Sequence, residues 1–121
     1  MNRDPSSGET PQGDKQQAAP ENLAAEMAEL VVAIAEHEDR TAFARLFGYY
    51  APRVKSYLRR LRVDERLAED IAQEVMLTVW RKAAQFDSSK ASAGTWIFTI
   101  ARNRFIDRVR REKRPGFDET D

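Results

Sequence analysis

Several kinds of residue are missing or scarce in this sequence, and each absence excludes a class of function. There is no cysteine, which excludes disulfides, thiol catalysis and zinc–thiolate sites. The one histidine, His37, has no second histidine at ligand spacing, so we expect a solvated side chain and no metal site. The sequence also has no Gly-rich phosphate loop and no His-based triad, and we therefore expect no enzyme, no catalytic residue and no cofactor.

Long apolar runs are also missing. No stretch approaches the roughly 20 apolar residues that a membrane-spanning helix needs. The N-terminus lacks the basic start and apolar run of a signal peptide. The sequence therefore predicts a cytoplasmic protein with no membrane insertion.

Glycine and proline are few, with five of each in 121 residues. Between Glu21 and Arg114, only Gly48, Pro52 and Gly94 interrupt a stretch that is rich in Ala, Leu, Glu and Arg. Such a composition indicates helices, and the length allows one small domain. We predict an all-α fold, a compact bundle of about four helices with short connections and largely antiparallel neighbours.

The chain divides into three parts by composition. Residues 1–20 contain Pro, Gly, Ser, Gln and Asp with almost no large apolar side chain, so we predict a disordered acidic and polar tail. Residues 21–114 form the predicted helical domain. Residues 115–121 follow the domain as the start of a linker or a frayed end.

Apolar residues recur at helical spacing in four segments, 21–38, 41–61, 65–85 and about 93–111. Suitable N-caps precede the later three: Asp39 or Thr41, then Asp64, then Ser92. Pro52 lies inside the second segment, and we expect it to kink or split that helix.

Charge is unevenly distributed along the chain, although the formal net charge is zero. Residues 1–40 hold nine acidic and three basic residues, whereas residues 41–121 hold seventeen basic and eleven acidic ones. This asymmetry indicates a nucleic-acid-binding domain with an acidic extension. A salt-bridged helical surface without a particular partner is the alternative.

The last predicted helix has two different faces. One sector carries Ile97, Phe98, Ala101, Phe105 and Val109 and should face the bundle. The opposite sector carries Trp96, Ile100, Asn103, Arg104, Asp107, Arg110 and Arg111. Guanidinium groups neutralise phosphates, Asn and Arg read base edges, and an aromatic ring stacks on a base, so this mixture favours a nucleic-acid surface. The helix macrodipole also favours basic residues near a C-terminus, which explains some of the arginines.

The loop before this helix, Phe86 to Gly94, contains one base, Lys90, and small hydroxyl side chains that include Ser92. Such a loop can shape a pocket for an extruded base. Its composition alone fits a plain connection between helices better.

Three stretches of the sequence resemble a known family. The runs AEDIAQEVMLTVWRKAAQFD (Ala68 to Asp87) and GTWIFTIARNRFIDRVRR (Gly94 to Arg111) are similar to region 2 of the extracytoplasmic-function (ECF) sigma factors. The preceding AFARLFGYYAPRVKSYLRRL resembles the opening helix of that region. The resemblance covers residues 41–114.

The resemblance implies a bacterial transcription initiation factor of the nucleoid. By similarity, the DxxQE motif, here Asp70, Gln73 and Glu74, docks on the clamp coiled coil of the largest subunit of core RNA polymerase. The last helix and its loop would recognise and melt the −10 promoter element by capturing bases of the non-template strand. The residues that we expect at DNA are Lys90, Ser92, Trp96, Arg102, Asn103, Arg104, Arg110 and Arg111.

Sigma factors of this type are commonly held inactive by an anti-sigma factor, which we expect as a further partner. They also continue into a second domain that reads the −35 element, and this sequence stops before it. We therefore expect an isolated domain that binds promoters poorly alone. Two alternatives are a generic helical DNA-binding regulator of intact duplex and an anti-sigma-controlled protein-interaction module.

Overall fold

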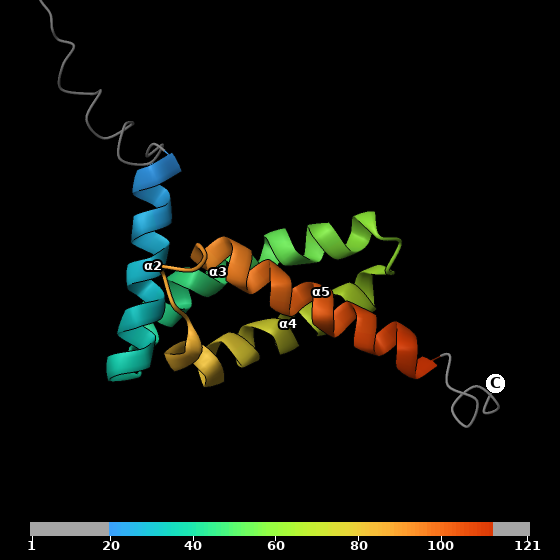
Figure 1. Cartoon of the computed structure of the whole chain (residues 1–121). Coiled ribbons are helices and arrows are strands. Elements are labelled where there is room, and N and C mark those ends of the chain that lie inside the picture. Colours follow the sequence, from blue (N-terminus) through green and yellow to red (C-terminus); the bar gives the residue numbers. More distant parts are fainter. Residues whose placement is uncertain (1–19, 113–121) are drawn as a thin grey trace, which may run out of the picture.

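The computed structural model describes residues 20–112 and consists of four α-helices with short connections (Figure 1). The helices are α2 (Pro20–His37), α3 (Arg40–Arg60), α4 (Glu65–Lys82) and α5 (Ala93–Glu112). A single 3₁₀ turn, η1 (Ala83–Gln85), follows α4. Within the described residues there is no strand, and the predicted all-α fold is confirmed. The predicted tail and C-terminal end lie outside these residues, except for Pro20, where α2 begins.

Three helices begin at the caps that the sequence predicts. In each case a side-chain oxygen accepts a hydrogen bond from the backbone N–H three residues later, at 2.8–3.0 Å. The pairs are Asp39 with Ala42, Asp64 with Leu67, and Ser92 with Thr95. Each cap satisfies a backbone donor that has no partner within its own helix.

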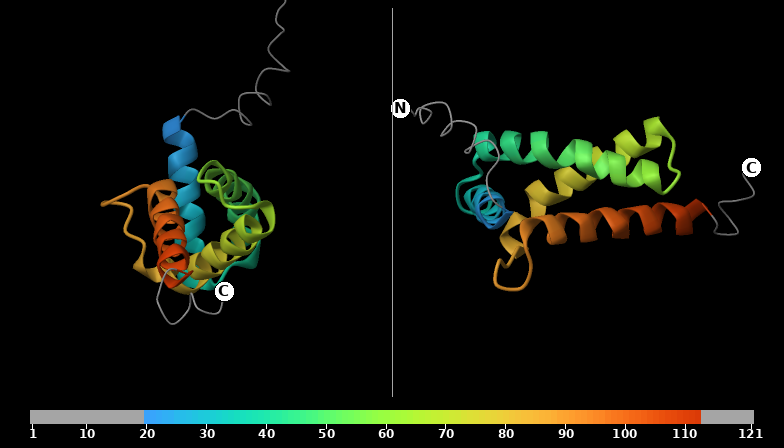
Figure 2. Two further views of the ribbon diagram at one scale, coloured as in Figure 1. Left: turned by 90° about the vertical axis from the view of Figure 1, so that its right-hand side faces the viewer. Right: turned by 90° about the horizontal axis from the view of Figure 1, so that it is seen from above.

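The helices are not all antiparallel neighbours. α3, α4 and α5 run along the length of the domain, whereas α2 crosses one end of the group (Figures 1 and 2). The two-residue link between α2 and α3 explains this turn, because Glu38 lies in the left-handed region with φ 50°. α2 is held there by buried Met27, Val31 and Ile34 and by an ion pair between Glu26 and Arg45 of α3.

Every helix contributes to one apolar core. Val31, Leu46, Ile71 and Ile97, one from each helix, have no exposed surface. The buried stripe of α5 contains Ile97 and Ala101 and turns the other side of that helix outward. The core therefore sets the rotation of α5 about its axis.

Pro52 does not split α3, so of the two predicted effects, a kink or a split, the split is wrong. The helix is continuous from Arg40 to Arg60. The amide that proline lacks would have paired with the carbonyl of Gly48, and both residues are exposed, so water can satisfy that oxygen. The next carbonyl, that of Tyr49, accepts a hydrogen bond from the Arg53 guanidinium at 2.9 Å. Solvent can thus replace the one backbone bond that Pro52 removes, and the Arg53 side chain adds a bond at the next carbonyl.

Gly94 sets how closely the start of α5 approaches α3. A Cβ at this position would lie 3.1 Å from the hydroxyl oxygen of Tyr50, and the ring carbons would be at 3.8 Å. Tyr50 is buried and packs edge-on against Tyr49 and Phe98, so its ring has little room to move. The absence of a side chain at Gly94 therefore allows the start of α5 to pack this closely against Tyr50 of α3.

We expect Gly94→Ala to lower the free energy of unfolding by about 1 kcal/mol, which is the lower end of the usual cost of overpacking. Urea denaturation measures the change. Adding Tyr50→Phe removes the hydroxyl that clashes and should recover most of the loss. If Tyr50→Phe does not restore the Gly94→Ala chain, this contact does not limit the approach of α5.

Candidate nucleic-acid and polymerase interface

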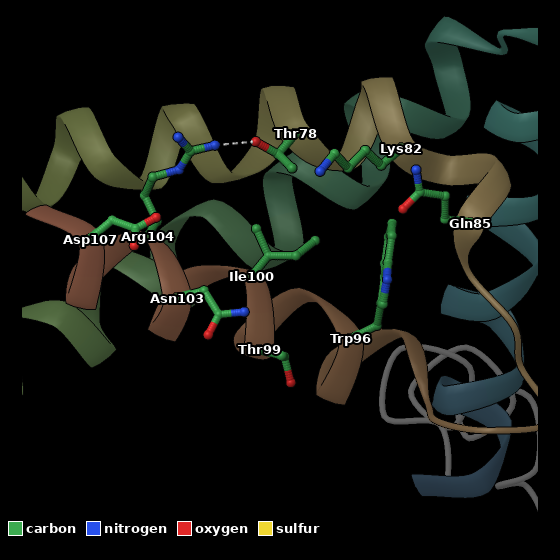
Figure 3. Close-up of a pocket in the computed structure, with 9 residues that line it drawn as sticks. All are labelled: Thr78, Lys82, Gln85, Trp96, Thr99, Ile100, Asn103, Arg104 and Asp107. Carbon is green, nitrogen blue, oxygen red and sulfur yellow. Dashed lines mark hydrogen bonds between the residues drawn. The ribbon is translucent and has the colours of Figure 1, made fainter.

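A groove of about 450 Å³ lies between α4 and α5 (Figure 3). One wall comes from α5: Trp96, Thr99, Ile100, Asn103, Arg104 and Asp107. The other wall comes from α4 and η1: Thr78, Lys82 and Gln85. Three residues that the sequence predicts at DNA, Trp96, Asn103 and Arg104, therefore line the same groove.

Trp96 stands near the end of the groove where η1 begins. Its indole lies 5.3 Å from the ring of Phe86, centroid to centroid, in a tilted arrangement. In Figure 3 the indole rises from α5 toward Gln85 and Lys82. Phe86 supports the indole within the protein, and the groove places amide and ammonium groups close by.

The residues of the outward sector of α5 differ in how far they are exposed. Trp96, Ile100 and Arg104 are half-buried, whereas Asn103 and Asp107 are exposed. The difference arises because α4 lies alongside α5 and covers one edge of that sector (Figure 2). The sector that the sequence predicts opposite the core therefore forms a wall of a groove, and its contact with nucleic acid stays a prediction.

The other predicted DNA-binding residues lie outside the groove lining. Arg102, Arg110 and Arg111 are exposed on α5, and Lys90 is exposed in the loop. Ser92 is exposed as well, but its hydroxyl caps α5 and donates to the Thr95 hydroxyl at 3.1 Å. The predicted cap at Ser92 is therefore formed, and its predicted contact with DNA stays a prediction.

A turn at Asp87 shapes the loop between η1 and α5. One carboxylate oxygen of Asp87 accepts from the Ser89 hydroxyl at 2.7 Å and from the Ser89 amide at 2.9 Å. These two bonds, the hydroxyl bond foremost, lower the pKa of the Asp87 carboxyl. The ionised carboxylate accepts both bonds, and Lys90 follows this turn directly.

The DxxQE residues lie on the outer side of α4. Asp70 and Gln73 are exposed, and the Glu74 side chain is 43% exposed. Leu77, one turn further along, is 52% exposed, which is unusual for a large apolar side chain in this domain. Sequence reasoning missed Leu77, although its position seven residues after Asp70 and three after Glu74 places it on the face of the DxxQE motif.

Glu74 turns toward α5 and contacts two of its arginines. One carboxylate oxygen lies 3.4 Å from Arg108 Nη1, and the other lies 4.0 Å from Arg104 Nε. Arg104 also donates from Nη2 to the hydroxyl of Thr78 at 2.7 Å (Figure 3). The predicted docking residue and a predicted DNA-binding residue therefore meet.

Sequence reasoning missed five polar residues at this site: Thr78, Lys82, Gln85, Thr99 and Arg108. Thr78 and Lys82 share a helix face because they are four residues apart. That spacing does not indicate that the face lines a groove. Nothing in the sequence alone aligns α4 with α5. Their register comes only from packing.

Two absences hold for the residues that the structure describes. Between residues 20 and 112, no group of three or more His, Asp or Glu side chains is placed to hold a metal ion. In the same part of the chain, no helix combines the length and apolar character needed to cross a membrane.

An all-helical domain with a groove that brings together an aromatic ring, amides and basic side chains has the chemistry of a nucleic-acid-binding protein. The family model "Sigma-70 region 2" matches residues 46–115, more than half of the chain. The chain belongs to this family, as the region 2 domain of an ECF RNA polymerase sigma factor.

Curated relatives agree with this family. The chain is 52% identical over 86 residues to the ECF RNA polymerase sigma factor RpoE of Cereibacter sphaeroides, covering 71% of this chain and 48% of that protein. It is 38% identical over 94 residues to the ECF RNA polymerase sigma factor SigK of Mycobacterium tuberculosis, covering 78% and 50%. The chain thus spans about half the length of the curated relatives that it matches.

A solved structure is similar as well. Rhodobacter sphaeroides SigE, crystallised in complex with the anti-sigma ChrR, matches with a TM-score of 0.65 and 51% sequence identity. The match covers 67% of this chain and 52% of that one. The predicted resemblance to region 2 of ECF sigma factors is therefore confirmed.

Proposed function

We propose that this domain docks on core RNA polymerase through the outer face of α4 and captures an unpaired promoter base in the groove between α4 and α5. One observation carries the proposal: an indole, an amide and basic side chains converge on one groove. Pockets of about 300–1,000 Å³ hold drug-sized ligands, so a groove of about 450 Å³ has room for one base.

The groove chemistry suits an unstacked base of the −10 element. Trp96 offers an aromatic ring, and stacking on such a ring contributes about 1–3 kcal/mol per base. Asn103 and Gln85 present amides that can donate and accept hydrogen bonds at a base edge. Capture of the base offsets an unstacking cost of roughly a few kcal/mol, so melting needs no chemical step.

The exposed cations outside the groove are placed to follow the DNA backbone. Arg102, Arg110 and Arg111 along α5, together with Lys90 in the loop, can each neutralise a phosphate. Phosphate contacts of this kind fix the register of the strand but carry no sequence information. We assign Ser92 to the loop wall of the site and base recognition to the groove.

The polymerase surface contains both polar and apolar groups. Asp70 and Gln73 are exposed, Glu74 is partly exposed, and Leu77 adds an apolar side chain on the same side of α4. Polar groups on a rigid helix give orientation, and an apolar residue beside them gives area to bury. By similarity to its family, we place the clamp coiled coil of the largest polymerase subunit on this face.

An anti-sigma factor is the second partner that we propose. The observation that favours it is the relative crystallised with the anti-sigma ChrR. We place the contact on a surface that overlaps the polymerase face of α4, so that the two partners compete. A factor with these partners works at the bacterial nucleoid, in the cytoplasm.

Charge reversal at Asp70 and Glu74 tests the docking surface. We expect the Asp70→Lys, Glu74→Lys chain to bind core RNA polymerase at least about tenfold more weakly. A polymerase surface that attracts the two native carboxylates would repel two lysines. Biolayer interferometry with immobilised core enzyme measures the affinity. Thermal unfolding by circular dichroism verifies that the variant remains folded.

The matched control reverses two charges on the exposed side of α2, Glu29→Lys and Glu36→Lys. α2 crosses the far end of the bundle from the start of α4 (Figure 1), so this variant should bind core enzyme like the parent. Equal binding by the parent and the α4 variant would show that the docking face lies elsewhere.

A further inference from the structure

We propose that Glu74 couples the two surfaces, by holding Arg104 and Arg108 of α5 in the free protein and releasing them to DNA when polymerase engages its carboxylate. The inference rests on the proposed function and adds a link between its two parts. It arises from contacts between residues far apart in the sequence, 34 positions for Glu74 and Arg108. Each partner of Glu74 belongs to the helix that we place on DNA.

The geometry makes Glu74 a shared residue. Its side chain is 43% exposed, which leaves it accessible to a protein partner on the outer side of α4. The same carboxylate lies 3.4 Å from Arg108 Nη1 and 4.0 Å from Arg104 Nε. Because one carboxylate has a limited number of acceptor sites, bonds to polymerase compete with the hydrogen bond to Arg108 and the ion pair with Arg104.

Thr78 gives Arg104 a second anchor. Its hydroxyl donates to the backbone carbonyl of Glu74 at 2.9 Å and is thereby oriented to accept from Arg104 Nη2 at 2.7 Å. Thr78 is only 5% exposed, so this bond lies in a sheltered place. Arg104 therefore stays at the groove when the carboxylate leaves it, with its charge no longer neutralised.

The strength of the contact suits a reversible link. The side chains of Arg104 and Arg108 are 31% and 24% exposed. Ion pairs in contact with solvent contribute little to stability, so replacing the arginines by polymerase at Glu74 costs little free energy. Linkage is reciprocal, which means that DNA bound to the freed arginines should strengthen polymerase docking by the same factor. We expect a factor of about two to five in each direction.

Neutralising Glu74 should reproduce the released state. We expect Glu74→Gln to raise the affinity of the 121-residue chain for single-stranded DNA about two- to fivefold. Asp70→Asn is the matched control, because it removes one negative charge from the same face of α4 and Asp70 forms no ion pair among the described residues. The probe is a labelled single-stranded oligonucleotide that the parent chain selects from a random pool, and fluorescence anisotropy measures binding.

The salt dependence separates release of the arginines from a change in folding. Each additional phosphate contact steepens the slope of log affinity against log salt by about 0.7 for single strands. Two freed arginines should therefore steepen it by up to about 1.4 in Glu74→Gln, and Asp70→Asn should leave the slope unchanged. Adding Arg104→Gln and Arg108→Gln should abolish the gain from Glu74→Gln, since the coupling needs both partners.

The outcomes distinguish the coupling from the proposed function. A steeper slope and higher affinity in Glu74→Gln alone support the coupling. Equal behaviour of Glu74→Gln and Asp70→Asn, or weaker binding by Glu74→Gln, overturns it and leaves the groove and docking assignments intact. A parent chain that retains no oligonucleotide from the pool overturns the proposed DNA site itself.

Discussion

A chain with alanine at both Trp96 and Asn103 should bind single-stranded promoter DNA at least about thirtyfold more weakly than the parent. Stacking of a base on Trp96 is worth about 1–3 kcal/mol, and hydrogen bonds from Asn103 to a base edge are worth about as much. The sum is at least about 2 kcal/mol, and each 1.4 kcal/mol corresponds to a factor of about ten in affinity. Fluorescence anisotropy with the selected oligonucleotide measures the change.

Core polymerase binding should be unchanged in this variant, because both residues lie in the groove and not on the outer face of α4. Trp96→Phe should retain most of the affinity, since stacking needs only an aromatic face. Thr99→Ala provides a control within the same groove, because the Thr99 hydroxyl already donates to the Thr95 carbonyl at 2.8 Å.

Duplex DNA distinguishes this site from that of a regulator that reads intact double helix. The parent should prefer single-stranded DNA, and the double variant should lose that preference. A parent that binds duplex better, or a Trp96 and Asn103 variant that binds single strands as well as the parent, would favour the alternative of a major-groove regulator.

The chain carrying Ile97→Ala should lose about 2–5 kcal/mol of its free energy of unfolding. Ile97 has no exposed surface and belongs to the stripe that orients α5. Small domains are stabilised by only about 5–15 kcal/mol in total, so a large share is at stake. Urea denaturation should show a lower midpoint with an unchanged slope.

Leu77→Ala is the matched control for this experiment, because it also truncates an aliphatic side chain to alanine. Leu77 is 52% exposed, and its truncation should change stability by no more than about 0.5 kcal/mol. If both variants lose stability equally, burial does not explain the effect at Ile97. Leu77→Ala should instead weaken docking on core polymerase.

Much of the candidate site could be predicted from the sequence because its signals are local or lie within one helix. Trp96 and Asn103 lie on one side of α5 through helical spacing alone, and the structure places both in the groove. The role of Arg104 could not be predicted in full. Its hydrogen bond to Thr78 joins residues 26 positions apart, and no periodicity within either helix encodes that contact.

The helix starts, the all-α class and the family follow from the amino-acid sequence alone. Caps at Asp39, Asp64 and Ser92 act over three residues, and apolar periodicity acts over one or two turns, so both can be read from neighbours in the chain. Three features required the packed helices: α2 crosses the end of the bundle, α4 supplies the second wall of the groove, and Glu74 meets the arginines of α5. Register and crossing follow from the fit of many side chains at once, and no single segment of the chain specifies that fit.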